Sequence, residues 1–365
     1  IKMLIVPVIF FSVTSGIAAI GDVQRLKRIG SKVVIVYFLM TVIACIVGIV
    51  MVNITHPGVG FTLDNMQAFD TSKVKTPSFV NFLFDMVPVN IVDSMAKNQI
   101  MQMIFFTVLV GVALVSLGEK VVGVTKIFDQ CASIIYKMLD IVMLYSPIGV
   151  LALMANTTAV FGPKLFGVLA KFVFTDWVGC LLIWFFFSGI VWLYTKVNYL
   201  EMCKSMIPIW VNTIATNSSA GTIPITLNVT TERLKVPMSI ASFSIPLGAT
   251  INLTGAALYK TILAFFVAEI YGLQLTIDQI LMVIIISTIM SIAAPGIPGG
   301  GIVTGAIFLN LLGLPMDLMG PIAGMYRLID MSHTTVNVSG DVLGTMLVAK
   351  NENIWTGEDF NKTLV

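Results

Sequence analysis

The sequence predicts an all-α membrane protein, a bundle of several spans with two re-entrant helical hairpins. Of its 365 residues, 57% are hydrophobic and only 11% are charged, whereas soluble proteins have about 25% charged residues. Apolar runs such as 33–52 and 100–117 are long and do not alternate with polar residues, which favours helices over a membrane barrel. Two later apolar segments are interrupted in the middle, and this pattern predicts the hairpins.

The spans follow from the apolar runs, taken in chain order. We predict helices at residues 3–20, 33–52, 79–92 (broken), 100–117, 134–154, 165–194, 238–267 and 319–348, with a polar loop at 56–77. The chain starts inside an apolar run with Ile1, so we expect at least one upstream helix to be missing, and no signal peptide is recognised. The four cysteines lie mostly in apolar surroundings without CxxC spacing, and we interpret them as small apolar residues.

Each predicted hairpin has a polar or glycine-rich centre. Residues 205–227 are interrupted by the polar stretch 212–222, and residues 280–312 by 293–301, which holds two prolines and four glycines. A non-helical backbone is tolerated at membrane depth only inside protein or beside a water-filled cavity. Paired breaks therefore indicate the midplane site of a transporter. The alternative for a single break is a kink in an ordinary helix.

The basic residues predict the orientation. Lys and Arg mark the cytoplasmic side of short loops, and all of the following fall on one side if both hairpins are re-entrant: Arg25, Lys27, Arg28, Lys32, Lys120, Lys126, Lys196, Lys204, Arg233, Lys235 and Lys350. We therefore expect a multi-pass protein of the inner or plasma membrane. The net charge of +2 gives no reason to expect a nucleic-acid partner.

The last span carries a cluster of ionisable residues. Tyr326, Arg327, Asp330, His333 and Asp341 lie within one otherwise apolar segment. A carboxylate at the centre of a membrane helix costs about 2.5–3.5 kcal/mol, so Asp330 and Asp341 are candidates for binding. The alternative is a buried ion pair or a charge at a helix end.

Four motifs carry a resemblance to a known family. They are NSSAGTIP at 217–224, PLGATINLTGAALY at 246–259, GIPGGG at 296–301 and IDMSHTTVNVSGD at 329–341. In this order they resemble the dicarboxylate/amino acid:cation symporters, which include glutamate and neutral amino acid transporters. The resemblance starts at the family's second transmembrane helix. It implies a homotrimer in the lipid bilayer, in which a transport domain slides like an elevator against a scaffold.

The resemblance also implies a division of the chain. The scaffold would comprise 1–32 and 54–160, and the transport domain 33–53 and 161–350, followed by a cytoplasmic tail at 351–365. Within the transport domain we expect an inner hairpin at 200–234, a helix at 237–269, an outer hairpin at 278–313 and the last helix at 317–350.

The resemblance implies a substrate site residue by residue. Asp330 would hold the α-ammonium of an amino acid, with Thr334 nearby, and Asn337 would donate to the α-carboxylate. Ser218 and Ser219 at the inner tip would complete the clamp, and Ile297 and Gly301 at the outer tip would close over the substrate. The alternatives are a packing amide for Asn337 and a helix cap for Ser219.

Three departures from the family pattern bear on the substrate. Members that carry acidic amino acids have an arginine in place of His333, a threonine in place of Ala256 and an acid in place of Tyr326. We therefore predict a neutral or polar side chain on the substrate. Arg327 lies about 120° round the helix from His333, and we expect it to point elsewhere. The alternative for His333 is a hydrogen bond between helices.

The resemblance implies up to three cation sites, built from oxygen ligands that suit a hard cation. The first consists of Gly248, Asn252, Asn337 and Asp341. The second consists of Thr250, Ser291, Ile292 and Ala294. The third, with Tyr37, Thr41 and Thr254, lacks the family's acid and is expected to be absent or weak. We expect one or two Na+ ions and no organic cofactor.

Lys260 is unusual because it lies in the interior of the expected transport domain. It is interpreted first as a fixed charge that replaces the lost sodium. A proton carrier and a lysine that extends to the membrane surface are the second and third interpretations.

We conclude from the sequence that the chain is a sodium-coupled symporter importing a neutral or polar L-amino acid. The first alternative is an acidic amino acid or dicarboxylate symporter, coupled to protons, with Arg327 as the anion anchor. The second is a gated anion channel of the same fold. An enzyme is not expected, because no nucleophile–base–orienter set and no zinc or phosphate motif is found.

Overall fold

The structure, a computed structural model, describes residues 5–8, 10–11, 14–18, 29–60, 84, 87–97, 99–145, 148–149, 151–152, 155, 159, 164–292 and 299–362. These residues form helices and turns, and the described part contains no strand. The α-helices are α1 (Ile5–Val8), α2 (Thr14–Ala18), α4 (Ser31–Thr55), α6 (Ile91–Ala96), α7 (Ile100–Leu117), α8 (Val122–Met143), α10 (Lys164–Thr195), α11 (Tyr199–Thr216), α12 (Ser219–Asn228), α13 (Met238–Ile251), α14 (Thr254–Ile270), α15 (Ile277–Ile292), α16 (Gly300–Leu311), α17 (Met319–Asn351) and α18 (Gly357–Asn361).

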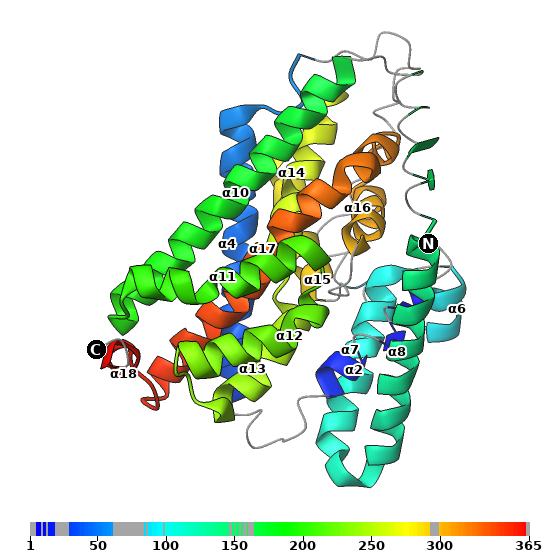
Figure 1. The fold of residues 1–365 in the computed structure, drawn as a ribbon. Coiled ribbons are helices and arrows are strands. Elements are labelled where there is room, and N and C mark those ends of the chain that lie inside the picture. Colours follow the sequence, from blue (N-terminus) through cyan, green and yellow to red (C-terminus); the bar gives the residue numbers. More distant parts are fainter. Residues whose placement is uncertain are drawn as a thin grey trace.

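The helices form two groups (Figure 1). The short helix α2 packs against α7 and α8, which run side by side at one edge of the molecule. The larger group contains α4 and α10 to α17, with α17 packed between α10, α11, α13 and α14. The core of the larger group is formed by α14 and α17, whose side chains are buried over most of their length.

Within the described residues, four helical stretches are long and apolar enough to cross a membrane: Ser31–Thr55, Gln102–Ile135, Leu165–Thr195 and Met238–Ile270. Helix α4 exposes large apolar side chains, including Ile35 and Leu39, of which more than half of the surface is accessible. Such a surface is stable in contact with lipid chains rather than water. The stretch Met238–Ile270 is instead almost wholly buried by other helices.

Two of the predicted helices differ from the structure. The span predicted at 134–154 begins at Val122, because Lys126 and Asp129 lie on an exposed face of α8 and do not end the helix. The helix predicted at 238–267 is broken into α13 and α14 at Asn252 and Leu253. Both residues have non-helical backbone angles (φ −105° and ψ 63° for Asn252), which turn the chain within the core.

Each predicted hairpin appears as two adjacent helices. Helices α11 and α12 pack together and meet at Asn217, whose left-handed backbone (φ 52°) ends the first helix. The hydroxyl of Ser218 caps α12 by accepting a hydrogen bond from Gly221 N at 3.0 Å. Helices α15 and α16 are the pair of the outer hairpin, and α16 is preceded by Gly299 with φ 75°. Residues 293–298 lie outside the described residues.

The segment after α17 returns to the start of the inner hairpin. The indole N–H of the buried Trp355 donates to Leu234 O at 3.1 Å. The Asn361 side chain donates to Lys196 O at 3.0 Å and accepts from Asn198 N at 2.8 Å. We call residues 355–361 the C-terminal clasp, because they join the α10–α11 turn to the end of the inner hairpin.

Candidate functional site

A stripe of polar residues runs along one face of α17. Asp330, Thr334, Asn337 and Asp341 are spaced by four, three and four positions, so they lie above one another on a helix. All four side chains are buried, with at most 8% of their surface exposed. A stripe of this kind inside an apolar bundle needs polar partners, because unpaired buried polar groups are costly.

The break between α13 and α14 supplies the first of these partners. The Asn252 amide donates to Asp341 Oδ1 at 2.9 Å, and Gly255 N donates to Asn337 Oδ1 at 2.7 Å. Because its oxygen accepts from Gly255, Asn337 directs its NH2 group to any further ligand. The break approaches α17 closely: a Cβ atom on Gly255 would lie 2.6 Å from His333 Cα.

The outer hairpin supplies the second partner. The backbone N–H of Gly299, at the start of α16, donates to Asp330 Oδ2 at 3.0 Å. The hydroxyl of Tyr326 donates to Asp330 Oδ1 at 3.4 Å. A carboxylate has about four acceptor positions, so Asp330 keeps acceptor capacity for a cationic group. Gly301 lies against the Tyr326 hydroxyl, and a side chain there would collide with it. Ile297, the other residue predicted at this tip, lies outside the described residues.

The inner hairpin tip lies beside the same helix. Ser219 is buried at the first position of α12, while the helix cap is Ser218. The neighbouring Asn217 amide donates to Arg327 O at 3.1 Å, which joins the tip to α17. Arg327 itself is exposed and donates to Ala215 O at 3.2 Å. The prediction that Arg327 points away from the other polar residues of α17 is therefore confirmed.

His333 makes a contact that the sequence analysis gave only as an alternative. Its Nε2 lies 2.8 Å from Oδ1 of Asp176 on α10, and both side chains are buried. Ser332 donates to the other oxygen of Asp176 at 3.1 Å. The Nδ1 atom of His333 is buried without a partner in the described part of the chain. The hydrogen bond between α10 and α17 is thus real, and a ligand-binding role for His333 can involve only Nδ1.

Sequence reasoning missed Asp176, although it is an acid in the middle of an apolar run, the signal that identified Asp330. Asp176, Cys180 and His333 form a group whose ligand atoms all lie within 4.8 Å of one another. The interpretation of Cys180 as merely a small apolar residue was therefore incomplete. Nε2 of His333 is already satisfied by the hydrogen bond to Asp176, so we interpret the group as a polar tie between helices.

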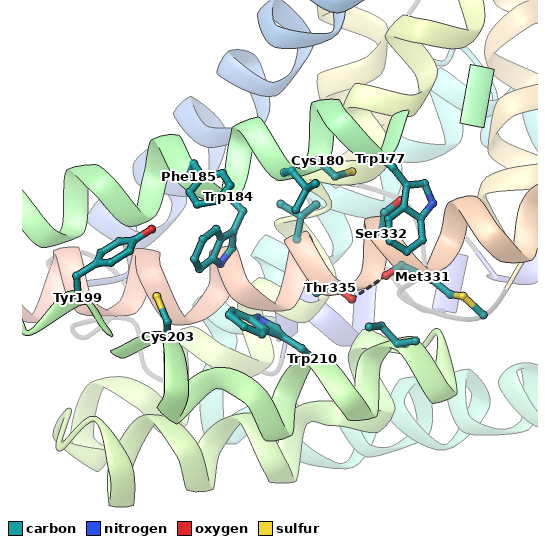
Figure 2. Close-up of a pocket in the computed structure, with 13 residues that line it drawn as sticks. Trp177, Cys180, Trp184, Phe185, Tyr199, Cys203, Trp210, Met331, Ser332 and Thr335 are labelled. Atoms are coloured by element: carbon teal, nitrogen blue, oxygen red, sulfur yellow. Dashed lines mark hydrogen bonds between the residues drawn. The ribbon is translucent and has the colours of Figure 1, made fainter. Parts of the chain in front are cut away.

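An apolar cavity lies behind this tie (Figure 2). It has a volume of about 480 Å³ and is lined mainly by aromatic and aliphatic side chains of α10, α11 and α17. Cys180 and Ser332 line it, as Figure 2 shows, and Ser332 also contacts Asp176. The α17 residues that line the cavity, including Met331 and Thr335, lie on the opposite face from Asp330 and Asn337. The cavity is therefore separate from the polar stripe.

The first predicted cation site fits the residues present. Asp341 is buried and has no cationic side chain within ion-pair distance among the described residues. The backbone of Gly248 lies close to Asp341 and to the Tyr37 hydroxyl, and a Cβ atom there would collide with Asp341 Oδ1. The Asn252 and Asn337 oxygens belong to the same cluster. A set of oxygen atoms around an unpaired carboxylate suits a hard cation.

The second predicted site has a buried ammonium beside it. Lys260 Nζ lies 3.2 Å from the hydroxyl of Ser291, whose backbone carbonyl was expected to bind sodium. Two unit positive charges about 4 Å apart repel by about 4 kcal/mol at an effective dielectric constant of about 20. Thr250 Oγ1 donates to Leu247 O, and Ile292 is the last residue of α15. Ala294 lies outside the described residues.

The third predicted site contains no acid. The Tyr37 hydroxyl donates to Ser244 O and Asp341 O, Thr41 donates to Tyr37 O, and Thr254 donates to Asn252 Oδ1. These hydroxyls donate to backbone oxygens and to the Asn252 side chain, and the absent or weak third site stays a prediction.

Lys260 is fully buried, so the interpretation as a lysine that extends to the membrane surface is wrong. Its ammonium donates to Ala256 O at 3.1 Å and to Ser291 Oγ. Among the described residues, the buried charged or titratable side chains include Asp176, Asp330, Asp341, Lys260 and His333. The described interior thus holds three carboxyl groups but only one lysine and one histidine. It therefore has more potential negative charges than positive ones.

Comparisons of the sequence with known proteins identify the family of the chain. Residues 1–351 match the model of the sodium:dicarboxylate symporter family. The chain is 30% identical to a proton/glutamate-aspartate symporter of Bacillus subtilis, over 99% of this chain and 88% of that protein. It is 32% identical to a proton/glutamate-aspartate symporter of Escherichia coli, over 97% and 83% of the two chains. A C4-dicarboxylate transport protein of Bacillus subtilis is 31% identical, over 97% and 85%.

The family resemblance inferred from the four motifs is confirmed by these matches. The chain belongs to the sodium:dicarboxylate symporter family, and it is a multi-pass membrane transporter rather than an enzyme.

Proposed function

We propose that this protein is a cation-coupled symporter for an amino acid, with acidic amino acids such as aspartate and glutamate as the first candidates. The observation that carries the proposal is the buried carboxylate of Asp330, which lies on the polar stripe and accepts from Gly299 N at the start of the outer hairpin. An ammonium group on the substrate would pair with this carboxylate and offset the cost of its burial.

The names of the relatives favour an acidic substrate over the neutral one that the sequence alone suggested. Two of them are described as proton/glutamate-aspartate symporters and one as a C4-dicarboxylate transporter. A dicarboxylate without an ammonium group would place two negative charges near Asp330, in an interior already short of positive charge. We therefore rank an acidic amino acid above a C4-dicarboxylate.

A neutral or polar amino acid is the second candidate. It is favoured by one observation: no arginine among the described residues faces the polar stripe, since His333 contacts Asp176 and Arg327 contacts Ala215. An acidic side chain on the substrate would then have to be bound without the bidentate pair that arginine provides.

The residues suggest how binding and closure are linked. Asn337 NH2 and the buried Ser219 would hold the α-carboxylate, and Asp330 the α-ammonium. Because Gly299 N donates to Asp330, the outer hairpin would close directly over the charged end of the substrate. A cation bound by Asp341, Asn252, Asn337 and Gly248 supplies positive charge beside the Asp341 carboxylate. The coupling cation is sodium, a proton or both.

The larger assembly is proposed from the family and the grouping of the helices. The group of α4 and α10–α17 would be the moving transport domain, and α2, α7 and α8 would belong to the scaffold of a homotrimer. We propose a location in the plasma membrane, with both hairpins re-entrant and the Lys/Arg-rich loops in the cytoplasm.

Uptake into proteoliposomes tests the proposal. Labelled aspartate, glutamate, serine, glutamine and succinate would be offered under separate sodium and proton gradients. We expect gradient-driven uptake of aspartate or glutamate that succinate inhibits weakly. Uptake of serine or glutamine that excess aspartate leaves unchanged would favour the second candidate. A substrate-independent anion current without uptake would contradict symport.

A further inference from the structure

Lys260 is a buried cation without an acidic partner. Its side chain has no accessible surface, and no carboxylate of the described residues lies within ion-pair distance of Nζ. The ammonium is held instead by two neutral oxygens, Ala256 O and Ser291 Oγ. A charge in such a place is costly, and this cost calls for an explanation beyond packing.

The position of the ammonium supplies the explanation. Ser291 lies in the last described turn of α15 and accepts a hydrogen bond from the ammonium with its side-chain oxygen. Ala256, the other acceptor, lies one turn before Lys260 on α14. The ammonium therefore joins the first arm of the outer hairpin to the helix that follows the break at Asn252.

The surroundings on α15 fit a cation as well. Ser287 lies one turn before Ser291, on the same face, and its hydroxyl is buried without a partner in the described part of the chain. The Sγ atom of Cys45, on α4, lies 3.9 Å from the Oγ1 atom of Thr288, which is also on α15. The side chains here are thus neutral groups with oxygen or sulfur atoms, and Lys260 supplies the positive charge.

We propose that the Lys260 ammonium is a covalently attached cation that replaces one of the mobile cations expected at the outer hairpin. The hairpin then needs no sodium at Ser291, and the Asp341 site is the only one of the three predicted sites left to bind a mobile cation. This inference rests on the proposed symport, and it deepens it by limiting the number of coupling cations.

The test replaces the side chain by a free cation of the same shape. Lys260→Ala removes three methylene groups and the ammonium, and n-propylammonium contains the same atoms. Thermal unfolding of the purified protein, without substrate, is measured with n-propylammonium, with sodium, and with n-propanol as the neutral compound of equal shape. We expect Lys260→Ala to lose stability and to recover it with n-propylammonium but not with n-propanol. Sodium should stabilise Lys260→Ala more than it stabilises the native protein, which already binds sodium at Asp341.

Two further variants serve as controls. Lys260→Met fills the space without charge, so we expect a loss of stability that n-propylammonium does not reverse. Lys171→Ala removes an exposed lysine that also donates to a backbone oxygen, His56 O at 2.7 Å; it should not respond to n-propylammonium and should respond to sodium as the native protein does. If Lys260→Ala folds only in the presence of n-propylammonium, that result also supports the proposal.

Equal rescue by n-propanol and n-propylammonium would overturn the proposal, because the lysine would then only fill space. A Lys260→Ala protein with unchanged stability, no response to n-propylammonium and the same sodium response as the native protein would overturn it too. Since no substrate is present, these outcomes do not depend on which amino acid is transported, and an error in the proposed substrate leaves the test valid.

Discussion

At the scale of single residues, Asp341 illustrates how a charge is kept in an apolar interior. Its carboxylate is 1% exposed and accepts one hydrogen bond from the Asn252 amide. One neutral donor does not compensate for the desolvation of a carboxylate, which amounts to several kcal/mol in real proteins. The carboxylate therefore needs a cation or a proton, and Gly248 brings the backbone of α13 against it, so close that a Cβ atom there would collide with Asp341 Oδ1.

We predict that Asp341→Asn abolishes cation-driven uptake while leaving the protein folded. Asparagine has the same shape but lacks the charge that a cation needs. The check is the sodium-induced rise in the unfolding temperature, which should be present in the native protein and absent in the variant. Asp93→Asn, a change at an exposed surface ion pair, is the matched control. A normal sodium response in Asp341→Asn would remove the cation from this site.

We predict that His333→Arg increases the preference for acidic over neutral amino acids. The longer side chain can keep a hydrogen bond to Asp176 and offer further N–H donors to a substrate carboxylate. Competition of labelled uptake by aspartate and by serine measures the preference. Unchanged selectivity in a folded variant would mean that His333 serves only as the tie between α10 and α17.

Charge in an apolar run was the sequence signal for Asp330 and Asp341, and both carboxylates are buried in the structure. Asn252 contacts Asp341, and Gly255, three residues after Asn252, contacts Asn337. Asp176 carried the same signal and was overlooked because no family motif covers it. The partner of Lys260 could not be predicted, since Ser291 reaches it only through the packing of α15 on α14.

At the scale of elements, the break between α13 and α14 depends on close packing. Gly255 lies so near α17 that a Cβ atom would be 2.6 Å from His333 Cα and 2.8 Å from Val336 Cγ1. Only hydrogen fits there, so α14 can bring its first backbone N–H groups against Asn337.

We predict that Gly255→Ala destabilises the protein by about 1–3 kcal/mol, the usual cost of overpacking a core. It should also weaken substrate binding, because it moves the break away from α17. The control is Gly189→Ala in α10, where an added Cβ meets nothing within 4 Å. Alanine is favoured over glycine in a helix by up to about 1 kcal/mol, so the control should be neutral or slightly more stable. Thermal unfolding distinguishes the two; equal stability would refute the packing argument.

The elements themselves were largely predictable. The long apolar runs predicted α4, α7 and α10. The polar centre predicted the pair of α11 and α12, and the glycine-rich centre predicted the pair of α15 and α16. The break at Asn252 was missed because it has no proline or run of glycines, and the hydrogen bonds made there come from α17, far along the chain. The start of α8 was missed because charges on an exposed helix face were taken for a loop.

At the scale of the whole molecule, the C-terminal clasp connects parts of the chain that are distant in sequence. Trp355 and Phe360 are buried, and Asn361 bonds both Lys196 and Asn198. The clasp thereby fixes the α10–α11 turn relative to the end of the inner hairpin at Leu234.

We predict that Trp355→Ala destabilises the protein by about 3–5 kcal/mol, as is typical when a buried large aromatic residue is truncated. Trp192→Ala is the matched control, because this tryptophan is 48% exposed. Its loss should cost much less. Unfolding of both variants in the same detergent is the measurement, and an equal loss would argue that the clasp does not hold the turn.

The clasp also has a consequence for the order in which the chain acquires its structure during translation. Asn198 and Asn361 are 163 residues apart, so at about 5–20 residues per second the ribosome takes roughly 8–30 s to make the intervening chain. Throughout this interval the α10–α11 turn lacks the partner that fixes it. The pair of α11 and α12 thus has one end unrestrained until α17 and the clasp have been made and have packed beside it.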